Sequence, residues 1–414
     1  MTEIRAIGRH VARAAPPAEQ PLLRRSFVLG LVSLACLIAG PSTAAPAEAE
    51  ASADAAAPLG ERTRQVFDRI WGYATFYDDP EGPILRRLAF KGRFQVDFPL
   101  FESNRGDYSE PQVRRLRLGL KADWAANLVA HLEVDLDVTC EKGESCQEDA
   151  YDRITDAYVS WKPNEAFGLK LGKASAGFTL DGATSSRSLI TLERNNVSNN
   201  LWFPIEYHLG VSASGKHNRW RYLAGVYSSA TSDELDAFGG GFFTLLTLAR
   251  DFSKQLGAAE ALLTLNYVYN QADKDNIATR DLSHVGSLHF RFDTGTFGFR
   301  SDLSGGIGYG SQSDLIGLAL VPFYHFNEYF QLVGRYTFIE SFGDDGIRFA
   351  RYENRIELER GDRYNEFFVG LNWFIYDHEF KVQTGFKYTM MDDLGQGGGD
   401  YRGWGWTTGL RMSW

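Results

Sequence analysis

Most of the chain after residue 88 alternates between apolar and polar positions with a period of two. Leu116, Leu118 and Leu120, for example, alternate with Arg117 and Lys121. Successive side chains of a β-strand point to opposite faces, so this pattern predicts amphipathic strands. We predict sixteen of them, at 88–98, 116–124, 128–138, 153–162, 166–173, 205–214, 218–228, 241–251, 259–270, 283–293, 296–309, 313–325, 328–340, 367–375, 380–390 and 404–414.

Two architectures produce such alternation, a soluble sandwich with its apolar faces inward and a membrane barrel with its apolar faces outward. The predicted strands have about ten residues, which is enough to cross a bilayer at a tilt. Aromatic residues gather near strand ends, as in the girdles of outer-membrane barrels, and the chain ends on an aromatic, Trp414. We therefore predict an all-β fold, a transmembrane antiparallel β-barrel of about sixteen strands.

Short and long connections alternate along the predicted barrel. The long ones are expected outside the cell and the short ones in the periplasm. The stretch 174–204 is the longest interior stretch without alternation. We predict that it folds into the lumen and narrows it, with Arg187, Glu193 and Arg194 at the constriction.

The N-terminal sixty residues differ from the rest. Arg24 and Arg25 precede the apolar run 27–40, and small residues follow it, which is typical of a secretory signal peptide. We expect a signal peptide over 1–49, an Ala/Glu-rich linker and periplasmic segment over 50–87, and the barrel over 88–414. Within the second part, 61–85 fits either a short helix or a segment tucked into the periplasmic mouth.

Composition excludes several classes of protein. The formal net charge is −10, and the chain lacks the basic block that nucleic-acid binding would need. The sequence contains no run of about eighteen apolar residues, so it predicts no membrane-spanning helix. The eight His are scattered without metal-ligand spacing, and no nucleophile, phosphate-binding or zinc-protease motif occurs. The sequence therefore predicts no enzyme activity, no cofactor and no metal site.

Charged residues on the polar faces are the candidates for function. A cation on the lipid face costs roughly 2–4 kcal/mol at the membrane midplane, so these charges belong in the lumen. The candidate anion-binding residues of the strands are Arg93, Arg115, Arg117 and Lys121, and the acidic stripe opposite them is Glu133, Asp135 and Asp137. Rings of cations favour the passage of anions. The alternative is a charge-balanced ladder that stabilises the wall.

Cys140 and Cys146 lie in one predicted long loop. Export reaches an oxidising compartment, and the spacing closes a small ring, so we predict a disulfide between them. Two free thiols are the alternative.

The sequence resembles a known family, the phosphate-selective porins O and P of Gram-negative outer membranes. No single string carries the resemblance; the order and spacing of several do. They are WGYATFY at 71–77, FKGRFQ at 90–95, VRRLRLG at 113–119, ITDAYV at 154–159, LKLGK at 169–173, TLER at 191–194, QLVGRY at 331–336 and TGLRMSW at 408–414.

The resemblance implies a trimeric barrel of sixteen strands that passes anions, phosphate among them. It places the basic pore residues at Arg114, Arg115 and Lys173. Strict alternation would put Arg114 and Lys173 on the lipid side, opposite to Arg115. The terminal strand ending at Trp414 resembles the signal that barrel assembly machinery recognises.

Our hypothesis is a passive outer-membrane porin for small hydrophilic solutes that prefers anions such as phosphate. Its expected partners are outer-membrane lipid, small anions, the assembly machinery and two further copies of the chain. A general or weakly cation-selective porin is the first alternative. An outer-membrane barrel enzyme or an adhesin is the second.

Overall fold

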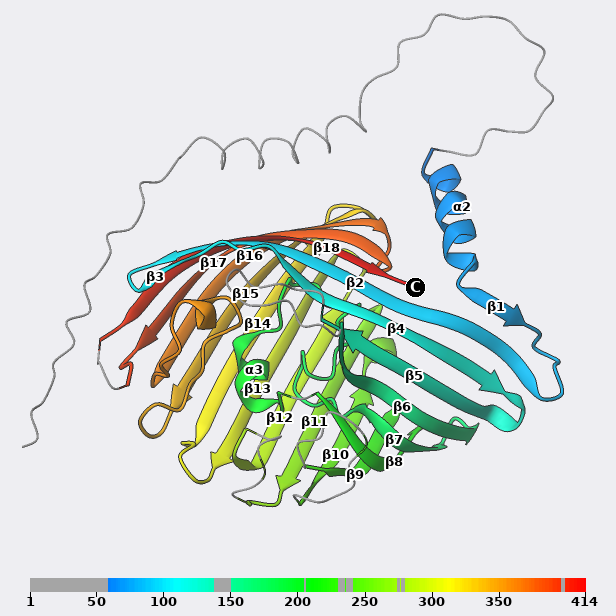
Figure 1. Cartoon of the computed structure of the whole chain (residues 1–414), viewed down its shortest axis with the longest axis horizontal. Helices are drawn as coiled ribbons and strands as arrows, with labels where there is room; N and C mark the ends of the chain where they lie inside the picture. The colour runs from blue at the N-terminus through cyan, green and yellow to red at the C-terminus, as the bar shows by residue number, and fades with distance from the viewer. Residues whose placement is uncertain are drawn as a thin grey trace, which may run out of the picture. The chain divides into compact units, whose positions relative to one another are not determined.

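The computed structural model describes residues 59–137, 150–204, 206–229, 235, 241–273, 276, 280–395 and 399–414. These residues form one compact unit, and its main feature is a closed antiparallel barrel (Figure 1). Each barrel strand pairs with its neighbours in sequence, and β18 pairs with β2 to close the ring. The predicted fold class is confirmed.

Sixteen strands make the barrel, and each overlaps one predicted segment. They are β2 (Leu85–Ser103), β4 (Gln112–Trp124), β5 (Leu128–Leu136), β6 (Tyr151–Asn164), β7 (Phe167–Ser175), β8 (Tyr207–His217), β9 (Trp220–Ser228), β10 (Phe242–Asp251), β11 (Glu260–Asn270), β12 (Leu282–Asp293), β13 (Phe297–Gly308), β14 (Leu315–His325), β15 (Phe330–Ser341), β16 (Arg363–Tyr376), β17 (Phe380–Asp392) and β18 (Tyr401–Ser413).

The remaining elements are short. They are the strands β1 (Thr75–Asp78) and β3 (Gly106–Tyr108), the helices α2 (Leu59–Gly72), α3 (Asn196–Leu201) and α4 (Ser253–Leu256), and the 3₁₀ turns η1 (Ala125–Asn127) and η2 (Glu353–Arg355). No helix in the described part of the chain is long and apolar enough to span a membrane. Of the two readings left open for 61–85, the structure has the helix, α2.

The connections differ in length at the two ends of the barrel. One end carries short links such as 165–166, 218–219 and 377–379, and we call it the short-turn rim. The other end carries the long links, and we call it the long-loop rim. The predicted alternation of short and long connections is therefore present.

The two faces of the wall differ as the alternation predicted. Leu120, Leu132 and Leu171 are exposed on the outer face, where the barrel would meet lipid. Arg117, Glu133 and other polar residues of the same strands are buried on the lumen face. Because lipid cannot satisfy polar groups, this arrangement suits a membrane-spanning wall.

Two local irregularities bring further cations to the inside. In the pairing of β2 with β4, Gln95 faces Arg115 and Val96 faces Val113, so Arg114 is the extra residue of a β-bulge. Two consecutive arginines can then both reach the lumen. On β7, Gly172 has a φ of +127°, which interrupts the alternation, and the next residue, Lys173, is only 2% exposed. Alternation alone would have given both cations to the lipid.

Two long connections fold into the barrel. We call residues 176–204 the first inward segment and residues 342–362 the second inward segment. The inward fold of the first was predicted from its lack of alternation; the second was expected only as a long connection, and its inward fold was not predicted. Packing explains that fold: Ile347, Phe349 and Tyr352 are buried apolar side chains that a solvated loop would leave in water.

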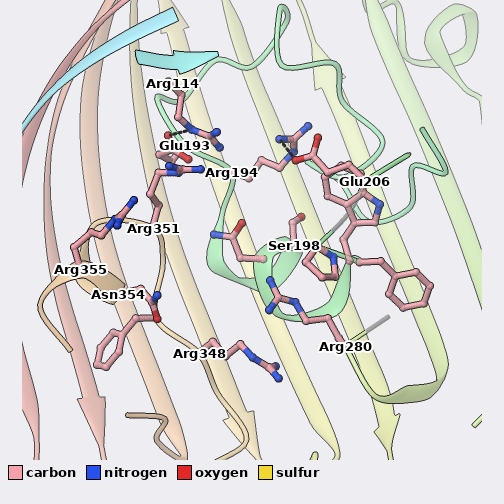
Figure 2. Close-up of a pocket in the computed structure, with 15 residues that line it drawn as sticks. Arg114, Glu193, Arg194, Ser198, Glu206, Arg280, Arg348, Arg351, Asn354 and Arg355 are labelled. Atoms are coloured by element: carbon pink, nitrogen blue, oxygen red, sulfur yellow. Dashed lines mark hydrogen bonds and ion pairs between the residues drawn. The ribbon is translucent and has the colours of Figure 1, made fainter. Parts of the chain in front are cut away.

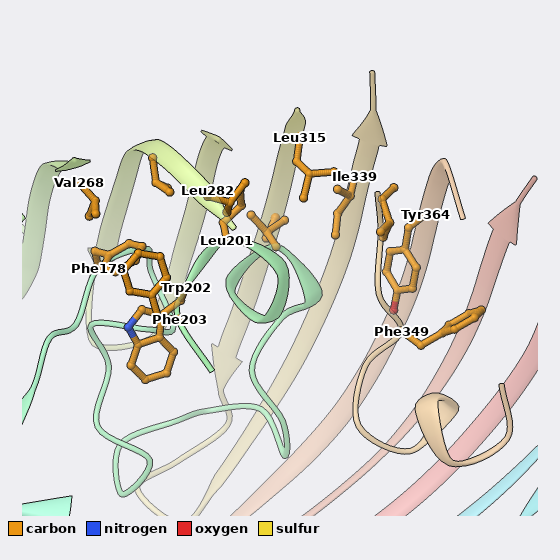
Figure 3. Close-up of a cluster of buried hydrophobic side chains, with 14 of the residues drawn as sticks. Phe178, Leu201, Trp202, Phe203, Val268, Leu282, Leu315, Ile339, Phe349 and Tyr364 are labelled. Atoms are coloured by element: carbon orange, nitrogen blue, oxygen red, sulfur yellow. The ribbon is translucent and has the colours of Figure 1, made fainter. Parts of the chain in front are cut away.

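The apolar side of the first inward segment fixes it to the wall. Leu201 and Trp202, at the end of α3, join a buried cluster with Leu282, Leu315 and Ile339 of the facing strands (Figure 3). Val197 lies so close to Gly317 of β14 that a Cβ there would come within 2.8 Å of it. The lumen face near the long-loop rim is therefore apolar, and α3 is seated on it.

Candidate functional site

The backbone of the first inward segment is held by polar side chains of β15, β16 and β17. Lys381 of β17 donates to the Leu189 carbonyl at 2.6 Å, and Asn372 of β16 donates to the Ile190 carbonyl at 2.8 Å. Arg335 of β15 donates to the Glu193 carbonyl at 2.8 Å. These bonds satisfy backbone groups that would otherwise be buried without partners. The segment therefore crosses the lumen as a fixed element.

The second inward segment is held by two acidic contacts. The Tyr352 hydroxyl donates to Asp97 Oδ2 of β2 at 2.6 Å. Glu353 accepts from Thr389 of β17 at 2.9 Å and forms an ion pair with Lys387. These bonds anchor η2 against the wall formed by β17, β18 and β2.

The two inward segments also contact each other. The Arg348 amide donates to Asn200 Oδ1 at 2.8 Å, and Asn196 donates to the Arg348 carbonyl at 2.9 Å. The bonds tie α3 of the first segment to the start of the second. They position the Arg348 side chain beside α3 (Figure 2).

A cavity of about 380 Å³ lies between the two segments and the wall. Six arginines and two glutamates line it, so its formal charge is strongly positive although the whole chain is acidic. The charged lining residues are Arg114, Glu193, Arg194, Glu206, Arg280, Arg348, Arg351 and Arg355. Trp202, Phe203 and Phe349 add aromatic surface.

At one end of the cavity, two arginines share one carboxylate. Arg114 forms an ion pair with Glu193, with Nε 3.0 Å from Oε1 (Figure 2). Burial disfavours ionisation of Glu193, but Arg114 and Arg351 outweigh it and hold the pKa of this carboxyl far below its usual range. Repulsion from Arg114, together with burial, lowers the pKa of Arg351. The carboxylate cannot neutralise both cations.

A second carboxylate lies among arginines just before β8. Glu206 Oε1 is 3.3 Å from Arg194 and 3.9 Å from Arg115. Burial opposes its ionisation, yet these arginines lower its pKa to about 2. The guanidinium of Arg194 also stacks over Trp202 at 4.6 Å from the ring centroid. Arg194 is thus oriented by a ring and a carboxylate, as a positioned cation at the cavity wall.

Arg348 and Arg280 form the other cationic end. Burial and the nearby Arg280 and Arg360 lower the pKa of Arg348, whose guanidinium donates to the neutral amide of Gln312 at 2.9 Å. Burial and Arg360 likewise lower the pKa of Arg280. Neither arginine has a carboxylate within ion-pair distance in the described residues. Because arginine stays protonated in proteins, this end holds more positive charge than the one carboxylate that acts on Arg348, Asp281, can offset.

The acidic stripe predicted opposite the arginines instead pairs with them. Arg117 contacts Asp135 at 2.9 Å and Glu133 at 4.0 Å on the neighbouring strand β5. Its side chain also donates to the Tyr207 hydroxyl. Asp137 follows β5 and is exposed. For Arg117 the structure therefore has the charge-balanced arrangement that was the alternative.

The other predicted basic residues are scattered over the lumen. Arg93 donates to Ser186 of the first inward segment, and Arg187 lies 3.5 Å from Glu133. Lys121 is partly exposed, 3.9 Å from Asp123. Lys173 of β7 is buried and interacts electrostatically with His208, near the start of β8. Only Arg114 and Arg194 of the predicted set line the cavity.

Cys140 and Cys146 lie outside the described residues. The predicted disulfide therefore stays a prediction. So does the signal peptide over 1–49, which also lies outside the described part of the chain.

Four cavity arginines were missed from the sequence: Arg280, Arg348, Arg351 and Arg355. Three of them share a recognisable signal, because RFARYENR at 348–355 places arginines three and four residues apart with Phe349 and Tyr352 between them. Buried aromatic residues within a basic loop indicate a loop that folds against the protein. Arg280, near the start of β12, has no such local signal.

The described residues contain no group of three His, Cys, Asp or Glu side chains that could hold a metal ion. The cavity instead gathers guanidinium groups. Guanidinium groups bind carboxylate and phosphate oxygens through two parallel hydrogen bonds.

A family model described as "Phosphate-selective porin O and P" matches residues 88–291. The matched residues make up just under half of the chain and are similar to that porin family. The match begins in β2 and ends in β12, so it includes the first inward segment and both β4 arginines. The predicted resemblance is confirmed.

Solved porins share the fold of the whole barrel. The outer-membrane channel DcaP of Acinetobacter baumannii is 13% identical and covers 79% of this chain and 97% of its own, with a TM-score of 0.52. OprB of Pseudomonas putida is 11% identical, covers 79% and 94%, and has a TM-score of 0.55. OmpF of Salmonella typhi is 12% identical, covers 79% and 98%, and has a TM-score of 0.54. No curated protein matches the chain.

The family match and the shared fold support an outer-membrane channel. A porin carries solutes through its lumen, so the groups that line the lumen decide which solutes pass. The cationic cavity between the inward segments is the candidate selective site of this channel.

Proposed function

We propose that this porin prefers small anions, with oxyanions of the phosphate type among them, and that the cavity between the inward segments selects them. The observation that carries the proposal is the lining itself, in which six arginines face two glutamates. Both glutamates are held ionised by arginines that outnumber them. The excess positive charge remains for the solute.

The geometry also favours passage over trapping. Arg194 is oriented by Trp202, and Arg348 by Gln312, so the guanidinium groups are fixed before an anion arrives. A preorganised site loses little entropy on binding. Several weak sites in series allow an anion to leave as well as enter.

The trimer, the cleaved signal peptide and recognition of the terminal strand by assembly machinery are part of this proposal. The family resemblance implies the trimer, the basic and apolar pattern of the N-terminus supports the signal peptide, and the ending on Trp414 supports recognition by the assembly machinery. Cross-linking in native membranes tests the trimer, and N-terminal sequencing of the mature protein tests cleavage.

The first experiment is the zero-current potential of the purified protein in a planar bilayer under a KCl gradient. We expect this potential to have the sign of an anion-selective channel. We also expect added phosphate to block the chloride current. Cation selectivity would overturn the anion preference and favour the alternative of a weakly cation-selective porin. Anion selectivity without block by phosphate would overturn the preference for phosphate and leave the preference for anions.

A further inference from the structure

Helix α2 is attached to the short-turn rim by three polar contacts. Arg64 forms an ion pair with Asp377 at 2.8 Å, Tyr376 donates to Asp68 at 2.6 Å, and Trp71 Nε1 donates to the Ser413 carbonyl at 2.6 Å. These partners belong to the β16–β17 turn and the end of β18. Figure 1 shows α2 and β1 beside the C-terminal end of the chain.

The helix contacts the outer face of the wall. The Phe67 and Trp71 rings pack on Tyr376 and Phe380, with ring centroids 5.3 to 6.5 Å apart. On β17, Lys381 is buried in the lumen, so its neighbour Phe380 points to the opposite, lipid side. Tyr376 pairs with Phe380 and shares that side. Helix α2 therefore lies outside the barrel.

A second face of α2 is apolar and uncovered. Val66 and Ile70 are one helical turn apart, and Tyr73 follows on the same side. Their exposed fractions are 57%, 51% and 75%. Gln65 and Arg69 lie on a third, polar side, about 100° per residue away from the apolar one. The helix thus presents one side to the barrel wall, one apolar side and one polar side.

Strand β1 extends the same apolar surface. It pairs with β2 where β18 has ended, with Thr75 opposite Ala89, and so covers a strand edge that would otherwise be open. Phe76 is 62% exposed and stacks on Phe90, with centroids 6.3 Å apart, and Phe90 contacts Trp414. Phe90 belongs to the lipid face of β2. The uncovered apolar surface is therefore continuous with the lipid face of the barrel.

We propose that α2 and β1 lie in the interfacial layer of the membrane at the short-turn rim, with Val66, Ile70, Tyr73 and Phe76 in contact with lipid. An amphipathic helix parallel to the membrane places its apolar side below the headgroups and its polar side in water. Exposed aromatic residues of the same rim, such as Phe326 and Phe330, mark that depth on the wall. The segment is then a membrane collar, a role independent of the channel's ion preference.

Site-directed spin labels on the full mature chain test the collar. Cys140 and Cys146 are first changed to serine, and single cysteines are introduced as Val66→Cys and Ile70→Cys. Gln65→Cys and Arg69→Cys, on the polar side of the same helix, are the matched controls. Each labelled protein is reconstituted in liposomes, and collisions of the label with oxygen, which concentrates in lipid, are compared with those of a water-soluble nickel complex.

We expect the oxygen-to-nickel collision ratio to be several-fold higher at positions 66 and 70 than at 65 and 69. Equal, nickel-dominated collisions at all four positions would place the helix in water and overturn the proposal. Protection of 66 and 70 from both reagents would show that protein covers them, and spin–spin broadening lost on dilution with unlabelled chain would identify a second copy.

Photolabelling of the wild-type protein in liposomes with a lipid-soluble diazirine gives a result that needs no substitution. Labelled peptides from 59–77 support the collar. Label restricted to the barrel strands contradicts it.

Discussion

Two groups of arginines in the lumen have opposite surroundings. Arg117 of β4 is 1% exposed and bonded to Asp135, Glu133 and Tyr207. Arg351 of the second inward segment lies beside Arg114, and the carboxylates that act on it, Glu193 and Asp97, are each already bound to another group. The difference teaches that arginines of one lumen can be neutralised to very different degrees. We expect an arginine to act on a solute only where it lacks a partner of its own.

The cause of the difference is the secondary structure. On the wall, strand pairing sets Arg117 directly opposite Asp135, so the register supplies a counter-ion. The inward segments have no such ladder, and their cations meet other cations where the two segments converge. We therefore expect wall arginines to support stability and cavity arginines to support selectivity.

The largest effect should follow loss of the wall pair. Arg117→Leu removes the most buried cation beside Asp135 and Glu133 and leaves them only the partly exposed Arg153 and Arg187, so we expect the free energy of unfolding to fall by about 3 kcal/mol. Urea unfolding of the protein in vesicles, followed by its loss of heat-modifiable migration, measures this change. The double variant Arg117→Leu/Asp135→Leu should recover most of the loss. An unchanged unfolding midpoint in the single variant would show that Arg117 does not stabilise the wall and would contradict this prediction.

Reversing the charge of Arg117 should affect folding as well as selectivity. Glutamate at position 117 would face Asp135 and Glu133, so we expect Arg117→Glu to prevent stable folding. Arg115→Gln, which adds no negative charge beside Glu206, can be compared with wild type for selectivity in the zero-current potential, because the ion pair that it removes is long, at 3.9 Å.

The effect of the arginines that surround Glu206 should appear in the pH dependence of stability. The pKa of this carboxyl is lowered to about 2 from an ordinary value of 4.5, so its stabilisation is complete above pH 4.5 and is lost as pH falls through about 2. The stability difference between wild type and Glu206→Gln should therefore shrink by roughly 3 kcal/mol between pH 6 and pH 2. Unfolding titrations at several pH values measure it, and a pH-independent difference would contradict the charge environment described.

The contact that anchors the second inward segment should have a smaller effect. Tyr352→Phe removes the hydroxyl that donates to Asp97 and should cost about 2 kcal/mol, as hydrogen bonds to charged groups do. A loosened segment should also raise the open-channel noise in single-channel recordings. Tyr388→Phe, on the lipid face of β17, is the matched control and should change neither quantity.

The smallest change in stability and the clearest change in selectivity should come from the cavity. Arg348→Gln/Arg351→Gln should leave the unfolding midpoint near that of wild type, because repulsion is removed together with charge. Loss of about 1 kcal/mol of attraction lowers the anion-to-cation permeability ratio roughly fivefold. The zero-current potential measures it, with Arg363→Gln at the exposed long-loop rim as control. Equal ratios in all three proteins would remove the cavity from the selective path.

Much of this architecture could be predicted because lipid imposes a simple rule. Each strand must be apolar on its outer face, and the sixteen predicted segments all coincide with barrel strands. The rule weakens near the long-loop rim, where Phe243, Val268 and Leu282 make the inner face apolar as well. There the pattern reflects packing of the first inward segment, which a period-two analysis does not detect.

The candidate site was only partly predictable. Arg114 and Arg194 were found through the family resemblance and the missing alternation of 174–204. Arg351 and Arg348 were missed because their position depends on contacts between segments far apart in the chain, such as Arg348 with Asn200. The pairing of Arg117 with Asp135 depends on strand register, which alternation does not determine.

The bulge at Arg114 gives the gene a simple way to change the channel. With one codon more than perfect register requires, β4 adds a cation to the lumen, while Arg115 keeps its place opposite Gln95 and Val113 its place opposite Val96. Loss of that codon would remove the charge and leave the rest of the ladder in register. The charge of the lumen can therefore evolve here by insertion and deletion, without the many compensating substitutions that a shifted strand would demand.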